Sequence, residues 1–233
     1  MQRITYIDNI RGIAFILMVI QHIFYFYDVS MNYETNISKN ILVDTSGTIA
    51  RTLFILLAGL SIGLSNTKVE GKKNKLKNRI KRSLEIGLHG LLITLVSYII
   101  YPDVFVRFGI LQFIAVGTFI MGMVAQYKNM SFVVIIICLL MERLTTTNNN
   151  ILDLMLGLNN RYSMMDYFPL LKWLPVMAVG VILGQNIKLN DNTNIKLLDN
   201  TNHLTNLGKN SLNLYTIHII VLMLYFSYIN KIR

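Results

Sequence analysis

The sequence is poor in cysteine and lacks several signatures of soluble enzymes. Cys138 is its only cysteine and lies within an apolar run. A single chain therefore has no internal disulfide and no metal site built on cysteine ligands. A phosphate-binding Walker A loop, a glycine-rich dinucleotide fingerprint and a Gly-x-Ser-x-Gly nucleophile elbow are also absent from the sequence. The enzyme classes that depend on these motifs are accordingly disfavoured.

Charge is also scarce, and acidic charge most of all. Charged residues make up 15% of the chain, and 22 lysines and arginines outnumber 12 acidic residues, for a net charge of +10. Such an excess can indicate a nucleic-acid partner. Its distribution argues otherwise, because eight basic residues lie between Lys68 and Arg82, directly after an apolar run. This pattern is typical of a cytosolic loop beside a membrane span, so we expect no nucleic-acid partner.

Long apolar runs dominate what is present. Hydrophobic residues make up 53% of the chain and the mean hydropathy is +0.48. Repeated apolar runs of about 17 to 20 residues exclude a soluble globule. We predict an all-α, polytopic membrane helix bundle, one domain over residues 1–233, with about seven transmembrane helices and a cytoplasmic N-terminus. The expected spans are Ile10–Tyr27, Thr48–Asn66, Ser83–Tyr101, Phe108–Tyr127, Met130–Leu144, Phe168–Asn186 and Ser211–Tyr228.

The basic loop sets the predicted orientation of the other connections. The loop Asp28–Gly47 is then expected outside, and the low-complexity stretch 187–206 is expected on the cytoplasmic side. Within that stretch, IKLNDNTN is nearly repeated by IKLLDNTN. Asn-rich sequence of this kind cannot build a core, so we interpret the stretch as a linker within the domain.

The first apolar run carries polar residues that membrane spans rarely hold. At about 100° per residue, Arg11 and His22 return to within about 20° of one helix face, and Asp8 lies within about 60° of both. Ionisable groups inside a span are costly, so each is a functional hypothesis. A neutral imidazole suits general-base work on a hydroxyl or amine, or attack on an activated acyl group. Arg11 suits the binding of phosphates.

Polar and small residues in the second and fourth expected spans have a structural interpretation as well as, in some cases, a functional one. Arg51 either binds an anionic ligand or extends to the membrane interface. Gln112 is expected to form an interhelical hydrogen bond, and the spacing of Gly59 and Gly63 predicts close helix packing.

The last span also carries a polar face. Ser211, Tyr215 and His218 fall within about 60° of one another around the helix. They line either a helix contact or the wall of a cavity. His218 and His22 have no third ligand at a suitable spacing, so the pattern does not indicate zinc.

Four further stretches follow the first run in order along the chain. They are FILLAGLSIGLS at Phe54–Ser65, FGILQFIAV at Phe108–Val116, DYFPLLKWLPVMAVGVILG at Asp166–Gly184 and LGKNSLNLYTIH at Leu207–His218. With these stretches the chain resembles, over most of its length, the catalytic domain of heparan-α-glucosaminide N-acetyltransferases. The Arg-x10-His spacing of the first run also resembles that of related membrane acyltransferases.

The resemblance implies a membrane acyltransferase that moves an acetyl group from cytosolic acetyl-CoA to an amino sugar or hydroxyl of a glycan on the outer side. It implies that His22 is the catalytic base or nucleophile. The chain departs from the animal enzymes, which carry their catalytic histidine in the outward loop after the first helix: Asp28–Gly47 contains no histidine, so the carry-over from the family rests on His22 alone. The other candidates are Asp166 and His218 for the catalytic step, and Asp8, Arg11, Arg51, Gln112, Asn210 and Ser211 for the acyl donor.

Two other interpretations stay open at this point. A small-solute transporter would use the same polar residues as a pathway, although no inverted repeat relates the two halves. The second interpretation is a catalytically inactive structural member of the same fold. It stays open because Gln112 stands where many relatives have His, and because Lys172 stands where they often have Pro. The expected partners are acyl-CoA, a surface glycan and membrane lipid, with no metal; self-association is left open.

Overall fold

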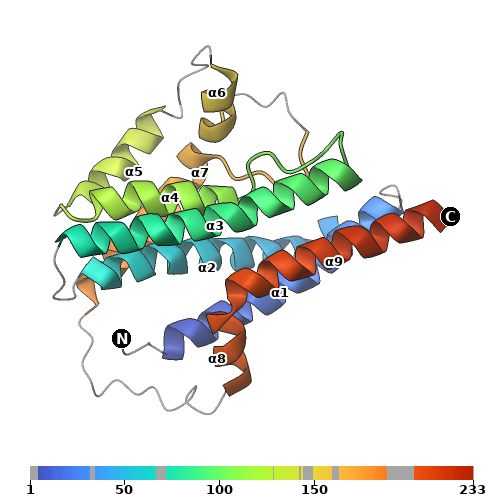
Figure 1. Ribbon diagram of the computed structural model, residues 1–233, viewed down its shortest axis with the longest axis horizontal. Coiled ribbons are helices and arrows are strands. Elements are labelled where there is room, and N and C mark those ends of the chain that lie inside the picture. The colour runs from blue at the N-terminus through green and yellow to red at the C-terminus, as the bar shows by residue number, and fades with distance from the viewer. Residues whose placement is uncertain are drawn as a thin grey trace. The chain divides into compact units, whose positions relative to one another are not determined.

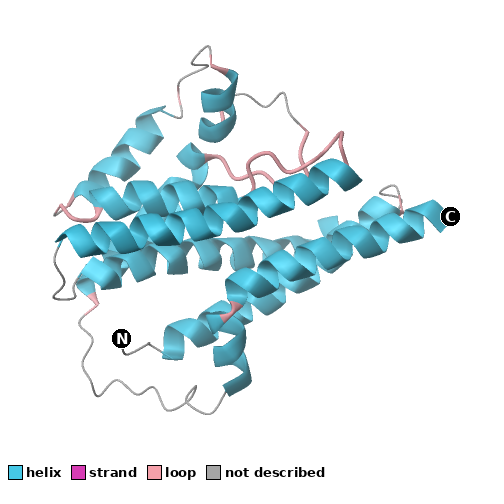
Figure 2. Ribbon diagram, in the orientation of Figure 1, coloured by secondary structure: helices cyan, strands magenta, loops and turns pink. Residues whose placement is uncertain are grey.

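The structure is a computed structural model, and it describes residues 5–31, 35–66, 72–127, 129–141, 143, 149–158, 163–187 and 202–232. Apart from one isolated β-bridge, the regular elements in these ranges are helices (Figures 1 and 2), which confirms the all-α class. Each predicted span coincides with a helix. The elements are α1 (Thr5–Ser30), the 3-10 helix η1 (Ile37–Lys39), α2 (Ile41–Asn66), α3 (Lys72–Ile100), α4 (Ile110–Val124), α5 (Met130–Met141), α6 (Asn150–Leu156), α7 (Leu170–Asn186), α8 (Asn202–Lys209) and α9 (Ser211–Ile232).

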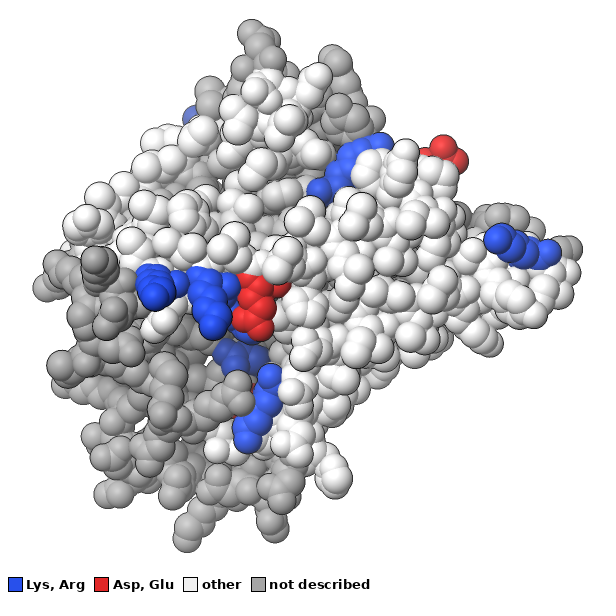
Figure 3. Space-filling view, viewed as in Figure 1, with Lys and Arg blue, Asp and Glu red and all other residues white. Residues whose placement is uncertain are grey.

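Four of these helices are long and apolar enough to cross a membrane: Thr5–Ser30, Ile41–Asn66, Leu76–Ile100 and Ser211–Ile232. On the face that Figure 3 shows, charged side chains gather in a few small groups and large areas carry none. The other three predicted spans correspond to α4, α5 and α7, with 15, 12 and 17 residues. At 1.5 Å per residue, 17 residues extend about 26 Å, short of a hydrocarbon core of about 30 Å. Four candidate spans are therefore found in the described part of the chain, and the predicted seven remain a prediction.

The connection between the first two spans is shorter than predicted. We expected a loop over Asp28–Gly47, but η1 and the start of α2 occupy much of it. Asp28 is fully buried, and its carboxylate accepts hydrogen bonds from Thr35 Oγ1 at 2.5 Å and from the backbone N–H of Ile37 and Ser38 at 3.0 and 2.6 Å. A buried carboxylate needs such donors, so Asp28 fixes the turn after α1.

Several predicted features fall on the undescribed part of the chain. Residues 68–71 of the basic stretch and residues 188–201 of the predicted linker lie outside the described residues. The helix α8 begins at Asn202, inside the stretch that we interpreted as linker.

The chain divides into two compact units, one formed by residues 1–54 and 189–233 and the other by residues 55–188. In the first unit α8 crosses the first turns of α1, and the chain then bends at Asn210 into α9, which runs alongside α1 (Figure 1). Ring contacts of His22 with His218 and of Phe26 with Phe226 show that α1 and α9 run in the same direction.

Two glycines and a buried polar pair hold α8 against α1. A Cβ on Gly12 would collide with the Leu204 carbonyl, and a Cβ on Gly208 would collide with the Asp8 carbonyl. Between these contacts Thr205 Oγ1 donates to Asn9 Oδ1 at 2.5 Å. Asn9 is fully buried and Thr205 nearly so. The side of α8 that bears Leu204, Thr205 and Gly208 therefore faces α1, and the opposite side is left for other contacts.

In the second unit, small residues bring α2 and α7 together. A Cβ on Gly59 or Gly63 would collide with a backbone carbonyl of α7, and a Cβ on Gly180 or Gly184 would collide with one of α2. Backbones can approach this closely only where side chains are absent. The close packing predicted from Gly59 and Gly63 is confirmed, and its partner surface is Gly180 and Gly184.

Candidate functional site

His22 of α1 and His218 of α9 form a hydrogen-bonded pair in the first unit. His22 Nδ1 and His218 Nε2 are 3.0 Å apart, and the two ring centroids are 5.3 Å apart. Both side chains are half-buried. Residues that are 196 positions apart in the sequence thus become one constellation because α9 packs along α1.

The other nitrogen of His218 decides which ring atoms carry hydrogen. His218 Nδ1 lies 3.1 Å from the backbone oxygen of Leu214. A carbonyl oxygen only accepts hydrogen bonds, so His218 Nδ1 is the donor. A neutral imidazole carries one hydrogen, so His218 Nε2 must accept, and His22 Nδ1 donates to it.

The same rule leaves the outer nitrogen of His22 unprotonated. With its hydrogen on Nδ1, a neutral His22 has a lone pair on Nε2. Among the described residues, no hydrogen-bond donor occupies that lone pair. The Leu214 carbonyl, His218 and His22 therefore form a directed chain that ends in an unprotonated ring nitrogen, the atom that a histidine uses as a base or a nucleophile.

Aromatic rings enclose the pair. Phe15 of α1 meets the edge of the His218 ring at 5.4 Å between centroids. Tyr215 is buried and lies 6.0 Å from the His22 ring and 5.2 Å from the His218 ring. Side chains packed in this way limit the rotation of both imidazoles, which fixes the direction of the hydrogen-bond chain. The polar face predicted for α9 is confirmed at Tyr215 and His218, which contact each other.

The basic candidates in this unit are engaged with neighbouring groups. Arg11 Nη1 contacts the carboxylate of Asp8 at 2.7 Å, and Asp8 is almost fully buried. Arg51 Nε donates to the Gly47 carbonyl at 3.1 Å, its Nη2 lies 3.7 Å from Asp44, and its charge also interacts with the His22 imidazole. Each guanidinium is only partly buried, so part of its surface remains available to an anion.

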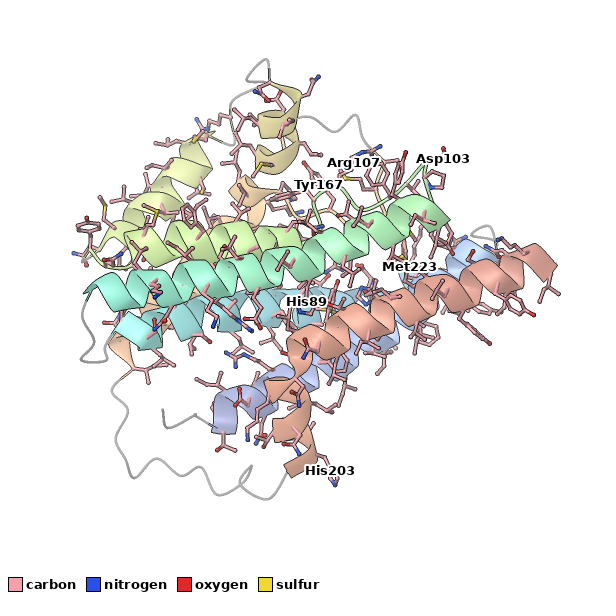
Figure 4. All side chains as sticks on the ribbon, viewed as in Figure 1. His89, Asp103, Arg107, Tyr167, His203 and Met223 are labelled. Atoms are coloured by element: carbon pink, nitrogen blue, oxygen red, sulfur yellow. The ribbon has the colours of Figure 1, made fainter. Side chains whose placement is uncertain are left out.

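A groove lies where α8 bends into α9. It has a volume of about 490 Å³ and is lined by His203, Asn206, Leu207, Asn210, Asn213 and Leu214. Asn210 belongs to the predicted donor-binding residues, and the structure assigns it to this groove. Ser211, the next predicted residue, is buried at the start of α9. Figure 4 shows the groove residue His203 at the far end of α8, with its ring directed away from α1.

Two of the predicted site residues, Gln112 and Asp166, belong to the second unit, where they connect helices. Gln112 Oε1 accepts from the Gly109 N–H at 3.1 Å, and its Nε2 donates to the Gly90 carbonyl and Thr94 Oγ1 at 2.9 and 2.7 Å. These contacts confirm the interhelical hydrogen bond expected of Gln112. Asp166 Oδ2 accepts from the Ile110 N–H at 3.0 Å, which places a carboxylate at the positive end of α4.

Comparison with known proteins identifies the family. The family model described as heparan-alpha-glucosaminide N-acetyltransferase, catalytic, matches residues 3–220. The chain belongs to this family. No curated protein and no solved structure matches the chain. Family membership and the long apolar helices together identify a membrane protein of the acetyltransferase class.

Sequence reasoning missed the groove and the direct contact between the histidines. The groove has a detectable signal, because residues 203, 206, 207, 210, 213 and 214 recur at the three- and four-residue spacing of one helix face, and three of them are Asn. The low-complexity interpretation of the adjoining stretch hid this periodicity. The histidine contact leaves no local signal, since it depends on how α9 packs against α1.

Proposed function

We propose that the chain is a multi-pass membrane acyltransferase that transfers an acetyl group from cytosolic acetyl-CoA to an amino sugar or a glycan hydroxyl on the outer side. His22 is its catalytic base or nucleophile, and His218 holds His22 in the reactive tautomer. The proposal rests on one observation above all: the chain of hydrogen bonds from Leu214 through His218 leaves the lone pair of His22 Nε2 open.

The direction of the helices is consistent with this topology. Helices α1 and α9 correspond to the first and seventh predicted spans and run in the same direction, as two spans separated by five crossings must. The basic stretch around Lys68–Arg82 favours the cytosolic side for the connection after α2. Acyl-CoA, which is cytosolic, then approaches from the end of α9 at which α8 lies.

In the base mechanism, His22 Nε2 removes a proton from the amine or hydroxyl of the acceptor as that atom attacks the thioester carbonyl carbon. The new C–N or C–O bond forms, the C–S bond breaks, and the thiolate of CoA leaves. The imidazolium returns its proton to the thiolate. Throughout, His22 Nδ1–H donates to His218 Nε2, so the positive charge that develops on His22 meets an oriented lone pair.

In the nucleophile mechanism, His22 Nε2 itself attacks the thioester carbonyl carbon. An acyl-imidazole forms while the C–S bond breaks and the thiolate of CoA leaves. The acceptor amine or hydroxyl then attacks the acyl carbon, the bond from that carbon to Nε2 breaks, and the proton of the acceptor passes through the released Nε2 to the thiolate. Both mechanisms require the same unprotonated Nε2. They differ in whether label from the acyl group becomes attached to the protein.

The decisive experiment is transfer of radiolabelled acetyl from acetyl-CoA to a panel of amino sugars by purified wild type and by His22→Ala. We expect transfer by the wild type, and a loss of about 10²- to 10⁴-fold in the variant, the range that a general base contributes. A His89→Ala variant is a matched control, because His89 is a half-buried histidine on α3 of the second unit. Equal transfer by wild type and His22→Ala would refute the role of His22.

A further inference from the structure

We propose that the groove at the bend between α8 and α9 binds the amide-bearing pantetheine arm of the acyl donor. This inference rests on the proposed function, since it concerns how the same reaction receives its substrate. The groove lies entirely within the first unit, the unit that carries the histidine pair.

The lining of the groove selects for a neutral, hydrogen-bonding ligand. Three of its six residues are carboxamides, Asn206, Asn210 and Asn213, and no lysine, arginine, aspartate or glutamate is among them. A carboxamide offers both donors and an acceptor, so a row of them pairs with peptide-like amide groups. The half-buried Leu207 and Leu214 offer apolar contact to the methylene groups between such amides. Among these lining residues, His203 is the one side chain that can carry a positive charge.

The amides are available for a ligand. In the described chain, the side chains of Asn206 and Asn213 have no hydrogen-bond partner, and Asn210 Nδ2 makes one bond, to the Asn206 carbonyl at 3.1 Å. All three residues are exposed. The packing of α8 produces this exposure, because Leu204, Thr205 and Gly208 face α1 and turn Asn206 outward.

The groove leads to the histidine pair. Leu214 lines the groove, and its carbonyl accepts the hydrogen of His218 Nδ1. His218 is four residues further on the same face of α9, a rise of about 6 Å. A chain-like ligand that lies along Asn206, Asn210 and Leu214 therefore points its end toward His218 and His22. The thioester is the end of the pantetheine arm, so this orientation presents the acyl carbon to His22 Nε2.

The test measures binding of two halves of the donor to the full-length protein. S-acetylpantetheine carries the amides and the thioester without phosphates, and 3′,5′-ADP carries the nucleotide without the arm. We expect Asn213→Leu to weaken binding of acetyl-CoA and of S-acetylpantetheine by about three- to tenfold, the loss of one hydrogen bond, and to leave the Kd of 3′,5′-ADP unchanged. Asn206→Leu should act in the same way.

Asn230→Leu is the matched control for Asn213→Leu. Asn230 is also an exposed asparagine of α9, but it lies about 25 Å beyond Asn213 along the helix. This control variant should change none of the three dissociation constants. The inference would be wrong if the groove variants weakened the binding of 3′,5′-ADP alone, or if they bound every ligand as the wild type does. The proposed function would stand in either case. If the wild type bound no acetyl-CoA at all, the proposed function would fail as well.

Discussion

The two units use their polar side chains in different ways. In residues 55–188, the amide oxygen of Gln112 accepts a hydrogen bond from the backbone, and its amide nitrogen donates to a backbone carbonyl and to a threonine hydroxyl. The two terminal nitrogens of the buried Arg79 guanidinium donate to the Gly122 carbonyl, Ser65 Oγ and Asn66 Oδ1, while its Nε has no hydrogen-bond partner in the described part of the chain. In the first unit, a comparable hydrogen-bond chain stops at His22 and leaves its outer nitrogen open. Gln112 and Arg79 connect helices through their hydrogen bonds, whereas an oriented imidazole with an open ring nitrogen is equipped for chemistry.

The comparison predicts that substitutions at the histidine pair of the first unit reduce turnover and that substitutions at the helix contacts of the second unit reduce stability. The first prediction concerns His218, the proposed positioning residue. We expect His218→Leu to lower kcat by roughly 10²-fold, because His22 Nδ1–H loses its acceptor and the ring can adopt the wrong tautomer, an error that costs up to about 10⁴-fold in a hydrolytic triad. Steady-state acetyl transfer measures the effect.

His218→Asn separates positioning from packing. An asparagine oxygen can still accept from His22 Nδ1–H, so we expect partial recovery of kcat with Asn but not with Leu. Both variants should bind acetyl-CoA as the wild type does. Equal losses for Asn and Leu, accompanied by equal falls in Tm, would mean that His218 serves only packing.

The second prediction concerns the helix contact of the second unit. Gly180→Ala should destabilise the protein by about 1–3 kcal/mol, because the Cβ of the alanine would collide with the Leu56 carbonyl and force α2 and α7 apart. Gly87→Ala is the matched control, since a Cβ there meets only Ala115 at 3.7 Å. Thermal unfolding in detergent should show a lower Tm for Gly180→Ala and an unchanged or higher Tm for Gly87→Ala. Unfolding at the same temperature would contradict the close packing.

The positions of the helices could largely be predicted from the sequence, because apolar runs identify them without knowledge of their neighbours. The contact between α2 and α7 could be predicted in part, since Gly59 and Gly63 indicate a close approach but not its partner. The turn between α1 and α2 depends on Asp28, whose donors come from residues 35–38 and are brought to it only in the folded turn. Local hydropathy contains none of that information.

The individual residues of the candidate site could be predicted from the sequence, but the contact between them could not. His22 and His218 each stand out as costly residues in apolar runs. Their pairing depends on the register of α1 against α9, which the contact of α8 with α1 helps to set through Gly12 and Gly208. The start of the short α8 was interpreted as linker because its sequence has little helix propensity. The helix is stabilised by packing on α1, which the local sequence does not show.

The third prediction tests whether Gln112 is part of the scaffold or binds the donor. Gln112→Leu removes a cap from the start of α4 and leaves the Gly90 carbonyl and Thr94 hydroxyl without this donor. We expect a loss of about 1–2 kcal/mol in stability. The Kd of acetyl-CoA, measured on the folded fraction, should not change. A weaker Kd with an unchanged Tm would assign Gln112 to donor binding instead.

The smallest expected effect is that of Arg11→Ala. Arg11 keeps a partly exposed guanidinium beside the buried carboxylate of Asp8, and it lies about 16 Å along α1 from His22. At that distance it cannot touch the acyl carbon, but it can contribute a charge-assisted hydrogen bond to a phosphate of the donor. We expect the Kd of acetyl-CoA to rise by up to about tenfold, or 1.4 kcal/mol, and kcat to stay within about twofold. Arg11→Lys should retain part of the affinity, because the charge remains and the bidentate geometry is lost. A fall in kcat at an unchanged Kd would place Arg11 with the chemistry of His22 and would remove the proposed separation between donor binding and catalysis along α1.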